Sequence, residues 1–180
     1  MGREGTDVLT KPTLLRPTTP PGVFRDARGT FVESWSGGFT AVAGLTSVSV
    51  RGALRGLHYQ RSNPRALLVR CVRGAIWDVC VDLRAGAGFG HWYSNVLNDL
   101  YYETLHVPAG FAHGFCAVVG PAVVVYEADR PFDAASESTL LWSDPLLRSA
   151  WYGIPRDIDL IVSEKDAVGR TLSETEALRV

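Results

Sequence analysis

Short apolar runs separated by glycine and proline recur along this chain of 180 residues, at spacings of about 8–12 residues. Residues 75–82 are typical: Trp77, Val79 and Val81 would share one face of a strand, and the even-numbered positions would share the other. A regular succession of many short strands predicts an all-β sandwich or barrel, and a small jelly-roll barrel is its natural form. Barrels of this kind bind ligands in their mouths.

Local patterns predict the finer elements. Residues 66–82 read as a β-hairpin that turns at Gly74. Pro121 separates two further predicted strands, residues 111–119 and 122–127. A short helical turn followed by a strand is expected within residues 39–49, and a short polar helix from about Ser173.

Composition limits the kind of protein. The length suits one domain spanning residues 1–180, in which proline-containing residues 1–20 form an arm or edge strand. A formal net charge of −1 argues against a nucleic-acid partner. No apolar run approaches the roughly 20 residues that span a membrane, and the N-terminus lacks the apolar centre of a signal peptide. Cys71, Cys80 and Cys116 lie in apolar runs, so we expect free thiols and a cytoplasmic location.

Polar side chains cluster in residues 52–60, a segment that otherwise resembles a strand. Regular alternation would place His58 and Gln60 on one face and Arg55 on the other. A histidine on an apolar strand face is often a satisfied core residue, but Arg55 and Gln60 lie close by and His113 occupies a second apolar run. This combination predicts a binding or catalytic site.

Five motifs occur in an order that resembles the dTDP-4-dehydrorhamnose 3,5-epimerase family: FRDARG (24–29), LRGLHYQ (54–60), VPAGFAHGFC (107–116), WSDP (142–145) and SEKD (163–166). The resemblance covers about residues 21–170. It implies a cupin-type jelly-roll β-barrel with an N-terminal arm, and a homodimer that exchanges N-terminal strands. It also implies a nucleotide-linked 4-keto-6-deoxy sugar as substrate, epimerised at C5, C3 or both without a metal or other cofactor.

The resemblance also implies roles for individual residues. A ketone at C4 acidifies the protons on C3 and C5, so a base can remove one and an acid can return one from the opposite face. His58 resembles the base, Asp166 the carboxylate that orients it, and Tyr126 the acid. From its position alone, Tyr126 could instead be a core tyrosine with a satisfied hydroxyl.

Further positions resemble those that hold the substrate. Arg55 resembles the arginine that binds the diphosphate, and a guanidinium fork suits phosphate geometry. Gln60 and His113 match other cavity positions. The nucleotide is held, partly across the dimer, at positions matched by Phe24, Arg28, Phe31 and Glu33. Arg28 and Glu33 could also form only a surface ion pair.

Several positions depart from the family pattern. Leu67 stands where members usually carry a lysine that helps to stabilise the enolate oxygen, and Phe132 replaces a second tyrosine. Ala43 and Leu45 replace an amide pair. Losing a preformed donor to an oxyanion often costs several kcal/mol, so these changes place double epimerisation in question. Arg61 and Arg65 lie close to Leu67 in the sequence.

Three other functions are open at this point. A metal-dependent cupin would need three imidazole or carboxylate ligands, which this sequence does not convincingly supply. A keto-sugar isomerase on the same barrel would also use a histidine base. A non-catalytic module that binds nucleotide sugars would explain the missing lysine.

Overall fold

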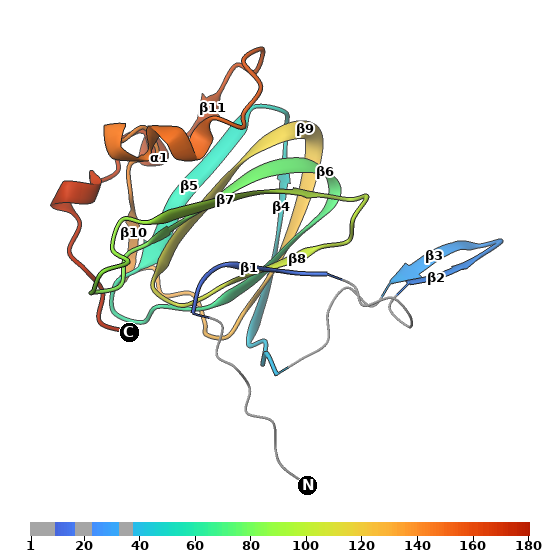
Figure 1. Ribbon diagram of the computed structural model, residues 1–180, viewed down its shortest axis with the longest axis horizontal. Coiled ribbons are helices and arrows are strands. Elements are labelled where there is room, and N and C mark those ends of the chain that lie inside the picture. Colours follow the sequence, from blue (N-terminus) through green and yellow to red (C-terminus); the bar gives the residue numbers. More distant parts are fainter. Residues whose placement is uncertain (1–9, 17–22, 33–37) are drawn as a thin grey trace, which may run out of the picture.

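The computed structural model describes residues 10–16, 23–32 and 38–180, and its regular structure is mainly β-strand (Figure 1). This agrees with the predicted all-β class. Among the residues that the structure describes, none of the helices has the length and apolar character of a membrane span. The strands are β1 (Thr13–Leu15), β2 (Val23–Asp26), β3 (Gly29–Val32), β4 (Ala43–Ser49), β5 (Ala53–Gln60), β6 (Leu67–Asp82), β7 (Trp92–Asn98), β8 (Thr104–Val107), β9 (Phe111–Ala128), β10 (Glu137–Thr139) and β11 (Ile161–Val162).

Two long antiparallel strands, β6 and β9, form the centre of the fold and pair from Leu67–Ala128 to Asp82–Phe111. The first part of β6 also pairs with β8, and its second part with β7. The first part of β9 pairs with β5, and its second part with β4. The two halves of the β6–β9 ribbon therefore pair with different neighbouring strands. Together these strands curve into a barrel (Figure 1).

Two sequence predictions are wrong at this ribbon. Residues 66–82 are not a hairpin, and Pro121 does not separate two strands, because β6 and β9 each continue through these positions. Gly74 has φ +77°, and a Cβ atom there would lie 2.4 Å from the carbonyl oxygen of Val119. The pairing register shifts around Gly74, so this glycine marks a bulge where the ribbon bends, and no chain reversal.

Alternating side chains fill two cores on opposite faces of this sheet. Val79 and Val81 pack in one core with segments from the C-terminal third, including the 3₁₀ helix η1 (Pro145–Trp151). Ile76 and Cys80 pack in the other. The predicted alternation of residues 75–82 is confirmed, and both faces are buried because the C-terminal segments cover the outer one (Figure 1).

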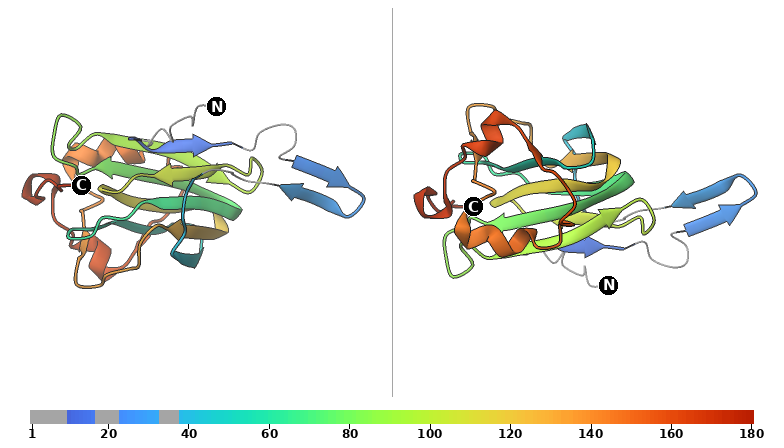
Figure 2. Two further views of the ribbon diagram at one scale, coloured as in Figure 1. Left: turned by 90° about the horizontal axis from the view of Figure 1, so that it is seen from below. Right: turned by 90° about the horizontal axis from the view of Figure 1, so that it is seen from above.

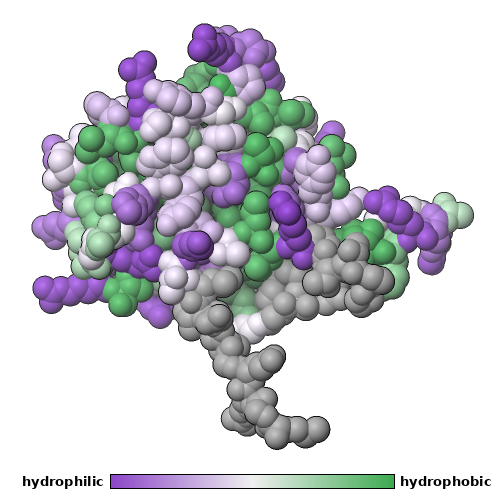
Figure 3. All heavy atoms as spheres, in the orientation of Figure 1, coloured by the Kyte–Doolittle hydropathy of each residue, from purple (hydrophilic) through white to green (hydrophobic). Residues whose placement is uncertain are grey.

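The β2–β3 hairpin lies away from the barrel in every view (Figures 1 and 2). Among the described residues its strands pair only with each other, whereas β1 pairs with β8 of the same chain as an edge strand. Phe24 and Phe31 lie opposite each other with ring centroids 6.1 Å apart, yet 51% and 70% of their surfaces are exposed. Apolar and polar side chains lie together on this hairpin (Figure 3).

The C-terminal third also differs from prediction in its helices. The α-helix α1 is Glu164–Ala167, and the 3₁₀ helix η2 is Leu172–Glu174, so no longer helix begins near Ser173. Ser163 caps α1, since its hydroxyl accepts a hydrogen bond from the Asp166 N–H at 3.2 Å. The expected helical turn before β4 is absent from residues 38–42. Most of the predicted arm, residues 1–20, lies outside the described residues.

Candidate active site

A cavity of about 370 Å³ lies between β4, β5, β6, β9 and α1. Its wall brings together six of the ten residues that the sequence singled out: Arg55, His58, Gln60, His113, Tyr126 and Asp166. These residues come from positions up to about a hundred residues apart, and the barrel and α1 bring them to one place.

His58 and Asp166 form a hydrogen-bonded pair at this cavity. The Nε2 atom of His58 lies 2.6 Å from Oδ1 of Asp166, and the second carboxylate oxygen accepts the Gly56 N–H at 3.2 Å. Asp166 is buried, while His58 is partly exposed to the cavity. An ionised carboxylate only accepts hydrogen bonds, so it favours the proton on Nε2 and leaves the Nδ1 lone pair to act as a base.

A bulge in β5 corrects the predicted faces. Arg55 and His58 both line the cavity, although regular alternation would place them on opposite faces. The pairing with β9 shifts register between these residues, and Gly56 has φ +112°. A Cβ atom at Gly56 would lie 2.7 Å from the Gly114 Cα, so only glycine fits this bend, which turns His58 toward Arg55.

Tyr126 on β9 adds a half-buried hydroxyl to the same cavity. Its ring meets the His113 ring edge-on, with the centroids 6.3 Å apart. Burial raises the pKa of Tyr126 well above its ordinary value of 10.0, while an interaction with the Ser47 hydroxyl has the opposite effect. The phenol is therefore kept protonated, as an acid must be before it donates.

His113 belongs to a second, buried pair. Its Nε2 atom lies 2.7 Å from Oδ2 of Asp78, and the Cys80 thiol lies 3.6 Å from the other oxygen. These are the ligand types of a metal site, with atoms within 4.8 Å of one another. Burial raises the pKa of the Cys80 thiol, so it stays protonated, and the His113–Asp78 hydrogen bond already uses the facing atoms. This arrangement suits a structural hydrogen-bond network better than a metal.

Arg55 and Gln60 reach the cavity but are also tied to the protein. Arg55 donates to the Ser49 hydroxyl at 3.0 Å and, more weakly, to a carbonyl of β4. Gln60 donates to the Asn63 carbonyl at 2.9 Å and accepts the Asp133 N–H at 3.0 Å. The Gln60 amide therefore connects two loops and supports the cavity rim. Because both of its polar atoms are already hydrogen-bonded, the amide is less able to bind a ligand.

The positions that depart from the family pattern also lie at the cavity, with one exception. Leu45, Leu67 and Phe132 line it, whereas Ala43 does not. Sequence reasoning missed Asp78 in the buried pair, and Glu137 and Lys165 in the wall. A signal for Asp78 was present, because it is a carboxylate on the face shared by Ile76 and Cys80.

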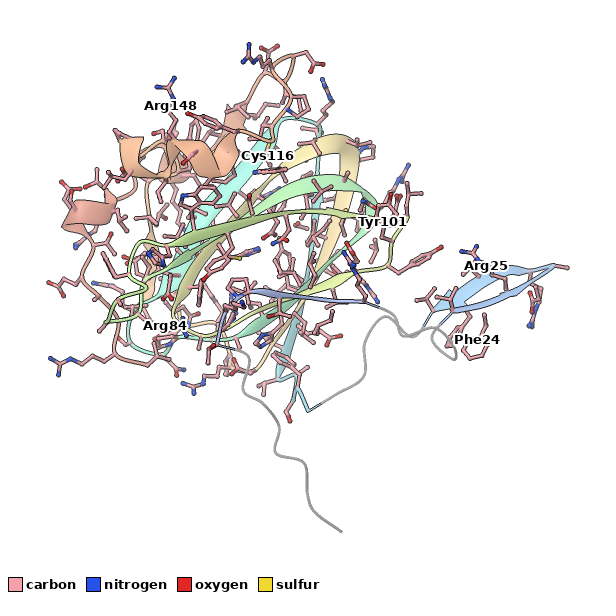
Figure 4. All side chains as sticks on the ribbon, viewed as in Figure 1. Phe24, Arg25, Arg84, Tyr101, Cys116 and Arg148 are labelled. Atoms are coloured by element: carbon pink, nitrogen blue, oxygen red, sulfur yellow. The ribbon has the colours of Figure 1, made fainter. Side chains whose placement is uncertain are left out.

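The structure does not bring Phe24, Arg28 and Phe31 to the cavity of their own chain. They lie on the protruding hairpin, where Figure 4 shows Phe24 and Arg25 on opposite sides. Arg28 pairs with Asp26, and its possible pairing with Glu33 lies outside the described residues. Within one chain, the predicted nucleotide positions and the predicted catalytic positions are separate.

Comparison with known proteins identifies the family. The family profile described as dTDP-4-dehydrorhamnose 3,5-epimerase matches residues 17–174. The chain belongs to this family. The enzyme of that name from Neisseria gonorrhoeae is 38% identical over 165 residues, which is 87% of this chain and 49% of that protein. The chain thus spans about half the length of that relative.

Two solved structures of the family are similar to this chain. The Legionella pneumophila dTDP-6-deoxy-D-glucose-3,5-epimerase, in complex with dTDP-4-keto-L-rhamnose, has a TM-score of 0.83 at 28% identity and covers 94% of this chain and 93% of its own. ChmJ, a 3′-monoepimerase from Streptomyces bikiniensis in complex with dTDP-quinovose, has a TM-score of 0.78 at 28% identity, with 91% and 84% covered.

These findings confirm three predictions from the sequence: the family, the cupin-type jelly-roll fold, and an epimerase of the isomerase class. They do not favour the keto-sugar isomerase or the binding module. No comparison tests the assigned site residues, which stay predictions supported by the geometry above.

Proposed function

We propose that this epimerase acts on a dTDP-linked 4-keto-6-deoxy sugar bound in the cavity, with His58 as base, Tyr126 as acid and Asp166 as the group that orients His58. The single observation that supports this best is the His58–Asp166 hydrogen bond of 2.6 Å at a cavity that Tyr126 also lines. The dTDP ligands of similar family structures support the nucleotide.

The proposed reaction begins when Nδ1 of His58 takes a proton from a carbon next to the C4 ketone. The electron pair of the broken C–H bond forms a C=C bond, and the carbonyl π electrons move to oxygen to give an enolate. The Tyr126 hydroxyl then donates a proton to the same carbon from the opposite face, which inverts the centre. Proton exchange with solvent restores the neutral imidazole and phenol. Buried Asp166 stabilises the imidazolium throughout.

Proton NMR in deuterium oxide tests this function. With dTDP-4-keto-6-deoxyglucose, an epimerase replaces the proton at C3, C5 or both with deuterium and yields an inverted product. A keto-sugar isomerase would instead produce a sugar with its carbonyl at C3. A binding module would leave both protons in place, and that result would contradict the proposal.

A homodimer in which the β2–β3 hairpin completes the partner's site is also part of this proposal. A two-stranded hairpin that pairs with nothing else is marginally stable in water, and Phe24 and Phe31 need an apolar cover. A partner's cavity rim would provide one and would unite the predicted nucleotide positions with His58. Since β1 pairs within its own chain, we assign the exchange to this hairpin.

We further propose a cytoplasmic role in making a deoxysugar for a natural product. The three cysteines are buried and free, which suits a reducing compartment. Leu45, Leu67 and Phe132 line the cavity where the family resemblance implies polar side chains, and this change of lining suits a modified sugar.

A further inference from the structure

Three cationic side chains line the described cavity: Arg55, Arg65 and Lys165. Two of them already have partners that neutralise or hold them. Arg55 bonds to Ser49 and a β4 carbonyl. The Lys165 ammonium lies 2.5 Å from the Glu137 carboxylate. A reaction that creates an enolate in this cavity needs a donor that is not already engaged, because a preformed donor stabilises the charge without rearranging first.

Arg65 offers such a donor. Its guanidinium lines the cavity without a hydrogen bond to any described residue; the Nη1 atom is covered by protein, so the N–H groups that can meet a ligand are the others. A buried donor without an acceptor is costly, commonly by about 1–3 kcal/mol. Burial also lowers the pKa of Arg65, an effect that the negative charges of Glu137 and Asp129 partly offset. The guanidinium is therefore held in a half-buried place, close enough to two carboxylates to feel their charge but hydrogen-bonded to neither.

The chain around Arg65 fixes where its side chain points. Arg65 lies two residues before Leu67, so in extended backbone both side chains fall on the same side, and both line the cavity. The intervening Ala66 donates to the Asp129 carboxylate at 2.8 Å and accepts the Asp129 N–H at 3.3 Å. These two bonds hold the backbone at the start of β6.

Phe132 holds the other end of the side chain. The guanidinium carbon of Arg65 lies 5.4 Å from the centroid of the Phe132 ring, within the range of a cation–π contact. A phenylalanine ring offers the cation a face and no competing hydroxyl. Leu67 likewise adds no second positive charge beside Arg65. The apolar substitutions at these two positions thus form a setting for one arginine.

We propose that Arg65 is a catalytic residue, which donates a hydrogen bond to the C4 oxygen of the sugar and stabilises the negative charge that forms there when His58 removes a proton. This role rests on the proposed epimerase function. It supplies the enolate-stabilising donor that Leu67 cannot, from a position two residues earlier in the chain. Arg55 is then left to bind the diphosphate.

The test compares Arg65→Gln and Arg65→Lys with Arg61→Gln, a neighbouring exposed arginine outside the cavity wall. Deuterium incorporation gives kcat and KM for each variant, and calorimetry gives the Kd for dTDP. We expect Arg65→Gln to lower kcat by about 10²–10³-fold, as for a lost oxyanion donor, with the Kd for dTDP unchanged. Arg65→Lys should recover part of the loss, and Arg61→Gln should resemble the unmodified protein.

An Arg65→Ala variant provides a second test that does not depend on the glutamine variant folding. Guanidinium chloride, at concentrations that leave the protein folded, should restore part of the deuterium exchange that Arg65→Ala has lost. It should not increase deuterium exchange by Arg61→Ala. Wild-type exchange by Arg65→Gln would overturn the proposal. So would a loss of dTDP affinity as large as the loss of kcat, because that would assign Arg65 to the diphosphate. Absence of exchange by the unmodified protein is a different result, which would contradict the epimerase function itself.

Discussion

The Asp166 carboxylate holds His58 with one oxygen and the Gly56 amide with the other. The residue that orients the proposed base is thus also bonded to the bulge that turns the base into the cavity. Because Ser163 caps the short helix through the Asp166 N–H, the position of the carboxylate is fixed from both its backbone and its side chain.

Replacing His58 with asparagine should abolish deuterium exchange at every carbon on which the enzyme acts. Asparagine preserves much of the polarity and size but cannot accept a proton at neutral pH, so we expect a loss of about 10²–10⁴-fold, typical of a lost general base. Circular dichroism and thermal unfolding would verify the fold. Exchange at the wild-type rate in a folded His58→Asn protein would show that another group is the base.

Replacing Asp166 with asparagine should reduce kcat by about 10²-fold or more, because an amide can also donate to Nε2 and stabilise the wrong tautomer. Glu164→Gln is the matched control, since Glu164 lies on the same helix but is exposed and outside the cavity wall. Rates measured by proton NMR should fall only for the Asp166 variant. Equal rates for both variants would contradict the orienting role.

Replacing Tyr126 with phenylalanine should separate proton removal from inversion. His58 can still exchange a substrate proton in deuterium oxide, but little inverted product should form, since the opposite face lacks its acid. Detection of deuterated substrate without epimer would support this division of labour. Rapid inversion by Tyr126→Phe would place the acid elsewhere.

The raised pKa of Tyr126 also predicts a pH effect. The folded state favours the neutral phenol. Below the ordinary pKa of 10.0, Tyr126 is therefore fully protonated and its contribution to folding stability is fully present. Both are lost only as pH rises through the higher pKa of the folded state. Inversion rates measured between about pH 8 and 10 should not decline through ionisation of Tyr126. Phenolate absorbance that appears in that range, and that Tyr126→Phe removes, would contradict the predicted shift.

Changing both hairpin aromatics, Phe24→Ser and Phe31→Ser, should weaken the dimer and reduce dTDP affinity together. The matched control is Val168→Ser, an apolar residue that is 80% exposed at the C-terminal end of α1. Light scattering would report the oligomeric state, and calorimetry the affinity. A double variant that stays dimeric with full dTDP affinity would show that the hairpin does not complete a neighbouring site.

Exchange at one carbon should greatly exceed exchange at the other, and we expect C5 to be the faster. A second inversion needs another round of enolate formation with the ring in a new position, and Phe132 lacks a hydroxyl that could direct it. Phe132→Tyr should therefore raise deuterium incorporation at the slower carbon, whereas Phe132→Leu should not. Equal incorporation at C3 and C5 by the unmodified protein would contradict this expectation.

The alternating pattern was sufficient to predict the strands, because the apolar side chains of Ile76–Val81 on β6 alternate between the two cores. It was not sufficient to predict their ends. Gly74 is compatible with both a hairpin turn and a bulge, and only the contact with Val119 across the ribbon decides between them. Local sequence contains no record of that distant carbonyl.

In the site, too, some features could be predicted from local sequence and others depend on distant contacts. Motifs around His58 and Asp166 predicted a pair that is 108 residues apart in the chain and hydrogen-bonded in the structure. The Asp78–His113 pair and the donor group of Arg65 were not predicted. The first depends on the register of β6 against β9, and the second on a buried Nη1 atom that no motif describes.

The continuous β6–β9 ribbon has a consequence for how the protein unfolds. The two strands contribute to both cores and carry Tyr126 and His113. Unfolding of one core should therefore disrupt the other core and the cavity as well. Heat or denaturant should remove the cavity and the fold in one cooperative transition. No fragment cut within the ribbon should retain ligand binding, and loops outside it, such as the exposed tip at Leu100, are the places where the chain should tolerate an insertion.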